Sequence, residues 1–494
     1  MKRRLVCVSN RISLPERGAP PGGLAVGILS ALRHTGGVWF GWSGDTADSP
    51  AARPEVAIRD NIRFATIDLL ASEFDAYYNG YANGTLWPLF HYFPGLFQHE
   101  QAHHDAYQAV NATFARQLTK LLKPDDAVWV HDYQLIPMAR QLRALDFRGP
   151  IGFFLHIPFP HVQVLRVLPN YERLVRDLCE YDLVGFQTED DVASFRSAVE
   201  RVMPAAVWTD NTVEVEGRSV HFGAFPIGID VDQVTRSASE GMADESMQRM
   251  AESLHGRKLI IGIDRLDYSK GLTERFAAFE QCLVTFPENR GNVTFLQVTP
   301  LSRTDVHAYT EIRATLEQMA GRVNGRFAEA DWTPIRYLNR NFSHETSLAF
   351  LRAANVAFVT PVRDGMNLVA KEFVAAQDAA NPGVLVLSEM AGAARELSGA
   401  LQVNPYDKAG MAIALHTALH MPLEERRQRH GQMLTAVREH DIHRWYSDFF
   451  RELTGESIGE PDERVVALRP RLRDVGALLS STARKWADRI TRSK

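Results

Sequence analysis

The sequence predicts an α/β protein built from two doubly wound domains that face each other across a cleft. Short apolar runs alternate with helix-length amphipathic segments, which is typical of βαβ units around a parallel sheet covered on both faces. This pattern occurs twice, and 494 residues exceed what one hydrophobic core usually supports. Polar residues also follow directly after several apolar runs, where doubly wound proteins bind ligands.

The expected strands fall into two sets. The first set contains "RLVCVSN", "DAVWVHD", "PIGFFLHIP" and "DLVGFQT", and the second contains "KLIIGIDRLD", "NVTFLQVTP", "NVAFVTP" and "GVLVLSE". The first set ends near "AFPIGIDVD", and a charged helical segment around 240–257 leads into the second. We therefore expect one Rossmann-like domain over 1–236, a second over 237–440, and a helical segment over 441–494 that crosses back and ends in a basic tail.

Composition restricts the class of protein. With 45% hydrophobic and 23% charged residues the chain is ordinary for a globular protein, and a net charge of -5 gives no reason to expect nucleic acid or an anionic membrane as partner. Cys7, Cys179 and Cys282 are too scattered for a disulfide framework or a cysteine metal site, which favours a reducing compartment. No signal peptide or membrane span is evident. We expect a cytoplasmic protein.

The strand ends of the first set carry several candidates. Arg11 follows the first strand, and the paired glycines Gly22 and Gly23 precede an apolar helical stretch. Such glycines let backbone N–H groups approach an anion at a helix N-terminus, although a plain turn is the more frequent use of a glycine pair.

Two histidines also follow strands of the first set. His131 and Asp132 are neighbours in "VWVHDYQL", so their side chains should point apart and not form a dyad. Asp132 is better suited to accept a hydroxyl hydrogen bond, with His131 in a structural role. For His156, in "FFLHIPFP", the residues alone favour a satisfied core histidine over a catalyst.

The second set adds cations and acids. Arg265 and Lys270 lie on one loop, which suits neutralisation of a diphosphate, unless they are surface charges paired with Asp264 and Asp267. "RDGMNLVAKE" follows another strand and supplies Asp364 for sugar hydroxyls, a turn and helix N-terminus for phosphate, and Glu372 about two helical turns later for a ribose.

One motif is also typical of a divalent metal site. Asp230 and Asp232 form a D-x-D, which in some enzymes that use sugar nucleotides holds a divalent metal and a nucleotide. A metal needs further ligands that the sequence does not identify. We therefore expect neither a metal nor any other cofactor.

Together, several motifs resemble one family. "SNR", "GGLAVGI", "WFGWSG", "YYNGYANGTLWPLFHY", "HDYQL", "FFLHIPFP", "RLDYSKGL", "SRTDV" and "TPVRDGMNLVAKEFVAAQ" occur in the order and spacing of the UDP-forming trehalose-phosphate synthases, glycosyltransferase family 20. The resemblance covers about residues 3–450. It implies the GT-B architecture and metal-independent transfer of glucose from UDP-glucose to glucose 6-phosphate, with retention of configuration.

The resemblance also assigns roles by position. Residues matching the acceptor site for glucose 6-phosphate are Arg11, Tyr78, Trp87, Asp132 and Arg303. Residues matching the UDP-glucose site are Gly22, Gly23, Arg265, Lys270, Phe342, Asp364, Leu368, Val369, Ala370, Lys371 and Glu372, while His156 matches a histidine at the donor sugar. Catalysis is expected to depend on Asp364, Arg265, Lys270 and His156.

Some positions depart from the family, and two other functions stay open. Phe93 stands where many relatives carry Arg, Gln134 replaces a common His, and Gln163 replaces a usual Glu. The chain could be an inactive sugar-phosphate sensor, or a sister enzyme such as a glucosylglycerol-phosphate synthase with another acceptor. The intact donor and acceptor motifs favour the glucose 6-phosphate enzyme. We expect a homo-oligomer, a dimer or a tetramer.

The tail has a pattern of its own. Val475, Leu478, Leu479 and Trp486 recur at roughly helical spacing on a basic background, which is typical of an amphipathic helix. Docking on the protein itself or in an oligomer interface is favoured over a partner or an anionic membrane, because Pro470 and Gly476 weaken a continuous helix.

Overall fold

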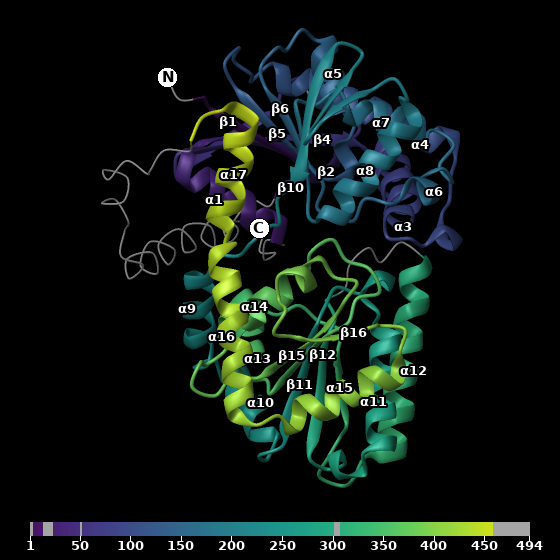
Figure 1. Cartoon of the computed structure of the whole chain (residues 1–494). Coiled ribbons are helices and arrows are strands. Elements are labelled where there is room, and N and C mark those ends of the chain that lie inside the picture. Colours follow the sequence, from purple (N-terminus) through teal and green to yellow (C-terminus); the bar gives the residue numbers. More distant parts are fainter. Residues whose placement is uncertain (1–2, 13–22, 50–51, 301–306, 458–494) are drawn as a thin grey trace, which may run out of the picture. The chain divides into compact units, whose positions relative to one another are not determined.

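The computed structural model describes residues 3–12, 23–49, 52–300 and 307–457 (Figure 1). Its first sheet has ten strands in the order β3-β4-β2-β1-β5-β6-β7-β10-β9-β8. The strands are β1 (Leu5–Arg11), β2 (Gly37–Ala47), β3 (Glu55–Arg59), β4 (Ile62–Leu70), β5 (Ala127–His131), β6 (Ile151–Phe154), β7 (Leu183–Phe186), β8 (Val207–Thr209), β9 (Thr212–Val215) and β10 (Arg218–Ala224). The seven central strands are parallel, and β3, β8 and β9 add antiparallel pairings at the two edges. All four predicted strands lie among the parallel ones.

The connections of this sheet are mostly helical, as βαβ units require. They are α1 (Gly23–Thr35), α2 (Ala71–Phe74), α3 (Trp87–Phe90), α4 (Gln101–Thr119), α5 (Met138–Ala144), α6 (Val162–Leu165), α7 (Tyr171–Leu178) and α8 (Glu189–Val202). Between α2 and α3 the chain forms a π-helix over Asp75–Leu86. The residues of β5, β6 and β7 are all buried, which explains why their sequences are continuous apolar runs and do not alternate.

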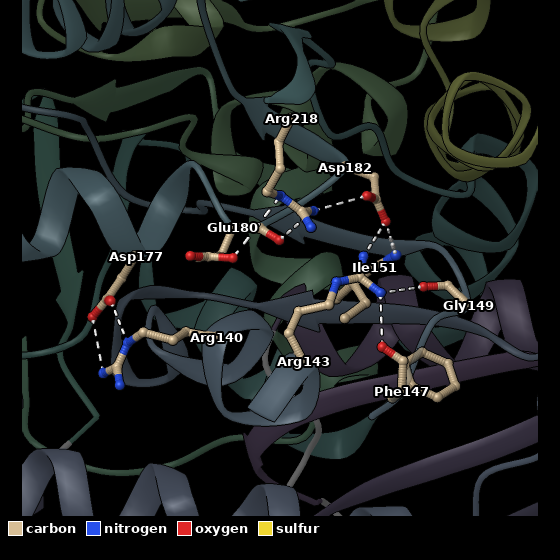
Figure 2. A network of polar contacts seen from close by, with 9 residues as sticks. All are labelled: Arg140, Arg143, Phe147, Gly149, Ile151, Asp177, Glu180, Asp182 and Arg218. Atoms are coloured by element: carbon tan, nitrogen blue, oxygen red, sulfur yellow. Dashed lines mark hydrogen bonds and ion pairs between the residues drawn. The ribbon is translucent and has the colours of Figure 1, made fainter. Parts of the chain in front are cut away.

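A network of charged side chains joins the amino ends of β6, β7 and β10 (Figure 2). Asp182 precedes β7 and accepts hydrogen bonds from Arg143 Nη2 (2.7 Å), the backbone N of Ile151 (2.7 Å) and Arg218 Nη2 (3.1 Å). Arg143 also donates through Nη1 to the carbonyls of Phe147 and Gly149. These bonds fix the loops at the end of the sheet opposite to the one where ligands are expected.

The second sheet is entirely parallel, in the order β13-β12-β11-β14-β15-β16. Its strands are β11 (Lys258–Ile263), β12 (Val293–Val298), β13 (Ile335–Leu338), β14 (Val356–Val359), β15 (Val384–Ser388) and β16 (Leu401–Val403). Its helices are α9 (Val231–Gly241), α10 (Glu245–Ser253), α11 (Leu272–Thr285), α12 (His307–Phe327), α13 (His344–Ala353), α14 (Leu368–Ala376) and α15 (Lys408–His420). The four predicted strands are present, and the two strands at the edges, β13 and β16, were not predicted.

The last two described helices, α16 (Leu423–Glu439) and α17 (Ile442–Thr454), bring the chain back to the first sheet. On α17, the ring of Phe449 stacks on Trp129 of β5, with centroids 4.4 Å apart. Gly152 and Gly185 provide the space, because a Cβ at either position would lie 2.7 Å from the Phe449 ring. The domain boundaries expected at 236/237 and 440/441 stay predictions.

Hydropathy of the helices gives one further result. Within the described ranges, the structure contains no helix that is both long enough and apolar enough to cross a membrane.

Candidate functional site

The carboxyl ends of β1, β5 and β6 gather predicted residues of the first sheet, since these three strands are neighbours. Arg11 ends β1, Asp132 follows β5 and His156 follows β6. Asp132 has a φ of 77° and a ψ of 165°, a conformation that is almost restricted to glycine, and strained residues of this kind are concentrated at functional sites. Its Oδ1 accepts a hydrogen bond from the backbone N of His156 at 3.3 Å. The loops after β5 and β6 are therefore joined directly.

His131 and His156 form a second link between these loops. His131 Nδ1 lies 3.2 Å from His156 Nε2. Burial lowers the pKa of His131 well below its usual value and that of His156 to about 3, so both imidazoles are neutral. As expected, His131 and Asp132 do not form a dyad with each other, and each contacts a different part of residue 156.

The predicted acceptor aromatics occupy two different environments. Tyr78 lies on the π-helix, partly exposed, with its ring stacked on Phe74 at 5.5 Å. Trp87, at the start of α3, is only 4% exposed, and the ring of His91 lies 4.1 Å from its own. The guanidinium of Arg265 lies 5.6 Å from the Trp87 ring. Tyr78 is thus the more accessible of the two flat surfaces.

Arg11 is exposed at the end of β1, with its guanidinium 5.5 Å from the ring of Trp42. Gly44 allows this position, because its Cβ would lie 2.5 Å from the Arg11 side chain. The aromatic ring holds the arginine while leaving its N–H donors exposed to solvent or a ligand.

In the second sheet, the loops after β11 and β14 meet through one ion pair. Lys270 Nζ lies 2.5 Å from Asp364 Oδ2, and Asn367 Nδ2 donates to the same oxygen at 3.0 Å. The side chains of Lys270 and Asp364 are each 13% exposed. The alternative in which Lys270 pairs with Asp264 or Asp267 as a surface charge is wrong. A cation and an acid predicted for the donor site therefore lie side by side.

Behind this pair lies Arg275, which the sequence analysis missed. Its side chain is fully buried on α11 and contacts Asp264 Oδ2 at 2.5 Å. It also donates to Gln297 Oε1 (3.0 Å), to Thr360 Oγ1 (3.0 Å) and to the carbonyl of Lys270 (3.3 Å). Burial raises the pKa of Asp264, against the lowering effect of Arg275. The only signal in the sequence is an arginine between Leu272 and Phe276, on the apolar face of α11.

The start of α14 is the point where the two sheets approach each other. Asn367 adopts a left-handed conformation with a φ of 77° and caps the helix, its Oδ1 accepting from the N of Ala370 at 3.2 Å. A Cβ at Gly23, which begins α1, would collide with the side chain of Leu368. A Cβ at Gly365 would collide with the carbonyl oxygen of His156. Glycine is needed at 365, where the obstacle is backbone, whereas at 23 the Leu368 side chain could rotate away.

Other residues predicted for the donor site have protein partners. Lys371 is fully buried, and its Nζ donates to the Ile227 carbonyl (2.9 Å) and to Glu396 Oε1 (2.8 Å). A ligand could therefore reach only its backbone. Glu372 Oε1 lies 3.2 Å from His344 Nε2, and this contact raises the pKa of His344.

Four further residues predicted for the donor site are Phe342, Leu368, Val369 and Ala370. The ring of Phe342 is partly buried below the guanidinium of Arg340, at 4.5 Å. Leu368 and Val369 are partly exposed on the first turn of α14, whereas Ala370 is buried. A ligand at this turn would therefore meet backbone N–H groups and small apolar side chains.

The D-x-D motif has a structural explanation. Asp230 is the N-cap of α9, and its Oδ1 accepts from the N of Gln233 at 2.9 Å. Asp232 is exposed in the first turn of the same helix. In the described ranges, no three His, Cys, Asp or Glu side chains are grouped so as to hold a metal ion. Independence of metal nevertheless stays a prediction.

Some predictions lie outside the described residues. They concern Gly22, Arg303 and the tail with Val475, Leu478, Leu479 and Trp486. Of the positions that depart from the family, Phe93 contacts the ring of Tyr268 at 4.9 Å, Gln134 is buried and Gln163 is exposed.

Two largely parallel, helix-connected sheets with polar residues at their strand ends are the architecture of the GT-B glycosyltransferases, and solved trehalose-phosphate synthases share it with TM-scores of 0.89. The family model of glycosyltransferase family 20 matches residues 15–455. A trehalose-6-phosphate synthase from Klebsiella pneumoniae is 46% identical over 473 residues, which are 95% of this chain and 99% of the relative. The chain belongs to glycosyltransferase family 20.

Solved structures show the same similarity. A UDP-forming α,α-trehalose-phosphate synthase from Burkholderia xenovorans, in complex with glucose 6-phosphate, is 48% identical with a TM-score of 0.88, over 91% of this chain and 100% of that chain. An E. coli structure bound with UDP-2-fluoro glucose is 44% identical with a TM-score of 0.87, over 91% of this chain and 98% of that chain.

Proposed function

We propose that this chain transfers glucose from UDP-glucose to glucose 6-phosphate with retention, forming α,α-trehalose 6-phosphate and UDP. The observation that carries this proposal is the convergence of predicted donor residues. Lys270 and Asp364 form an ion pair at the ends of the neighbouring strands β11 and β14, and Gly365 packs against the carbonyl of His156 from the first sheet.

The acceptor is assigned to the strand ends of the first sheet. Arg11 offers a guanidinium fork for the 6-phosphate, and Arg303 is the second candidate cation. Tyr78 offers a ring face to the pyranose, and Trp87, whose ring contacts Arg265, offers a second one that is more buried. Asp132 offers a carboxylate to sugar hydroxyls from a backbone conformation that its hydrogen bond to His156 helps to maintain.

The donor is assigned to the second sheet. Arg265 and Lys270 face the diphosphate, the first turn of α14 supplies backbone N–H groups, and Glu372 accepts from ribose hydroxyls. Asp364 accepts from hydroxyls of the transferred glucose. Asp364 already pairs with Lys270 in the protein. Binding of the donor therefore replaces this ion pair by a contact of Lys270 with the diphosphate and a contact of Asp364 with the glucose.

The chemistry needs no protein nucleophile. The bond between the anomeric carbon and the UDP oxygen breaks as the acceptor hydroxyl forms its bond on the same face, and a phosphate oxygen of the donor takes the acceptor's proton. Arg265 and Lys270 stabilise the negative charge that grows on UDP. The remaining residues hold donor and acceptor in position, so catalysis depends on orientation and electrostatics.

The decisive experiment measures UDP release with several acceptors under otherwise equal conditions. Glucose 6-phosphate should be far better than glucose, which lacks the anion, and than glycerol 3-phosphate, which lacks the ring. Preference for glycerol 3-phosphate would support a sister enzyme. Absence of turnover with retained binding of glucose 6-phosphate would support a sensor.

Two further assignments belong to this proposal. The three cysteines are free and buried, which suits a reducing cytoplasm. The protein acts as a homo-oligomer, either a dimer or a tetramer. Size-exclusion chromatography with light scattering tests the second assignment, and a purely monomeric protein at working concentration would contradict it.

A further inference from the structure

The contact between the buried side chains of His131 and His156 restricts which ring nitrogens carry their protons. His131 ends β5 and His156 follows β6, and the register of these strands places His131 opposite Phe154. One ring nitrogen of each imidazole takes part in the contact, Nδ1 of His131 and Nε2 of His156, at 3.2 Å. A contact between two neutral imidazoles can hold only one proton, so the two rings must have the same tautomer: either both carry the proton on Nδ1, or both carry it on Nε2.

Aromatic side chains surround the pair and keep both rings neutral. The ring of Trp129 lies 4.6 Å from His131, and Phe154 lies 4.6 Å from His156. From α17, Trp445 lies 5.9 Å from His156 and 6.2 Å from His131. Burial lowers the pKa of both imidazoles, so neither carries a second proton near neutral pH.

The second nitrogen of His131 decides between the two possible tautomers. Nε2 of His131 is buried and finds no hydrogen-bond partner in the part of the chain that the structure describes. If Nε2 carried the proton, a buried N–H would be left without an acceptor, which is rare in proteins and costly. The proton of His131 is therefore better placed on Nδ1, inside the contact.

We propose that His131 is a positioning residue that donates its Nδ1–H to Nε2 of His156 and thereby holds His156 as the Nδ1–H tautomer. His156 then always presents a hydrogen-bond donor, never an acceptor, through its remaining ring nitrogen. His131 thus acts through His156 without touching a ligand. Asp132, the next residue, supports the same loop by accepting from the backbone N of His156.

The consequence for ligands rests on the proposed function. With the donor sugar at His156, the imidazole donates to a hydroxyl oxygen, and that hydroxyl's own proton is free for an acceptor in the protein. The inference about the tautomer does not depend on this step, because it follows from the contacts of the two rings alone.

The direct test is a long-range ¹H–¹⁵N NMR spectrum of the full chain with ¹⁵N-labelled histidine imidazoles. A His156→Gln variant assigns the signals of His156. We expect the pattern of a neutral Nδ1–H imidazole for both His131 and His156. An Nε2–H pattern for His156 in the unmodified protein would overturn the inference, whatever the activity.

Two variants of His131 separate positioning from packing. His131→Asn keeps an N–H donor close to the place of Nδ1, whereas His131→Phe keeps a ring and removes the donor. We expect kcat/KM for UDP-glucose to fall about threefold to tenfold in the Phe variant and less than about twofold in the Asn variant, with the KM for glucose 6-phosphate unchanged in both. An equal loss of kcat/KM in folded His131→Asn and folded His131→Phe would contradict the role of His131 as a hydrogen-bond donor.

The inference and the proposed function fail in different ways. A chain with the Nδ1–H tautomer at His156 but without transferase activity would overturn the proposed function and support the inference about His131. Normal transferase activity with the Nε2–H tautomer would do the reverse.

Discussion

Two ion pairs at the carboxyl edge of the second sheet differ in their access to solvent. Asp264 and Arg275 are 3% and 0% exposed, and three further acceptors, on Gln297, Thr360 and Lys270, bind Arg275. Lys270 and Asp364 are each 13% exposed. A buried pair stabilises one arrangement and is costly to break, while an accessible pair can exchange partners. The sealed pair therefore belongs to the scaffold, and the open pair is the one that a ligand could divide.

The largest expected effect comes from breaking the sealed pair. Arg275→Met leaves Asp264 buried without its cation and removes the bond to the Lys270 carbonyl, so the free energy of unfolding should fall by about 3–5 kcal/mol. Denaturant unfolding of the two proteins measures this loss. As a control, Arg313→Met removes an exposed pair with Glu317 and should change stability very little. Equal stability of the Arg275 variant and the unmodified protein would remove the distinction between the two pairs.

The next effect concerns the open pair. Asp364→Ala should lower kcat/KM for UDP-glucose roughly 10- to 150-fold, because a lost hydrogen bond to a charged group costs about 1.5–3 kcal/mol. The fold should remain, since this side chain is not sealed in the core. Asp230→Ala is the matched control, because it removes a helix cap, costs about 1 kcal/mol of stability and should leave transfer intact. Turnover within twofold of normal in folded Asp364→Ala would exclude Asp364 from the donor site.

A third prediction extends the comparison to the two sheets. Arg11→Ala should lower the affinity for glucose 6-phosphate roughly 10- to 150-fold and barely change the affinity for UDP, because Arg11 lies at the end of β1. Arg265→Ala should instead lower the affinity for UDP and also lower kcat, since Arg265 faces the charge that develops on UDP in the transition state. Isothermal titration with each ligand, together with steady-state kinetics, separates these patterns. Equal losses for both ligands in either variant would show that the division between the sheets is wrong.

The smallest expected effect is that of metal removal. Lys270 and Arg265 are proposed to supply the positive charge that a divalent cation supplies in other enzymes, so excess EDTA should change the rate of UDP release very little. A complete loss that Mg²⁺ or Mn²⁺ restores would contradict this. It would also return Asp230 and Asp232 to consideration as ligands.

The sequence was most informative where one physical rule determines both the residue pattern of a segment and its place in the fold. Buried parallel strands must be apolar throughout, so eight of them could be recognised, and the polar residues that follow them necessarily lie at the carboxyl edge. Lys270 and Asp364 were therefore both assigned to this edge from the sequence, although the ion pair between them was not predicted. The edge strands β13 (IRYL) and β16 (LQV), by contrast, are partly exposed and contain polar residues, so they show no continuous apolar run.

Residues that depend on tertiary contacts could not be predicted. Arg275 has the sequence of an ordinary helical arginine, and only packing shows that it is sealed against Asp264. Lys371 was assigned to the ligand with the rest of its segment, yet its side chain is directed to Glu396 and the Ile227 carbonyl. The strained backbone conformation of Asp132 is likewise a product of its surroundings, because residues other than glycine almost never adopt it.

The packing of α17 on the first sheet affects how the chain folds while it is being synthesised. Phe449 packs over Gly152 and Gly185 and stacks on Trp129, so the cover of this apolar surface is complete only after α17, roughly 300 residues later, has been made. At about 5–20 residues per second, a ribosome needs roughly 15–60 s to make that stretch. During this interval the nascent first sheet displays aromatic rings and glycine-lined hollows that attract chaperones or other unfinished chains. Correct folding of the earliest part of this protein thus depends on the latest described part.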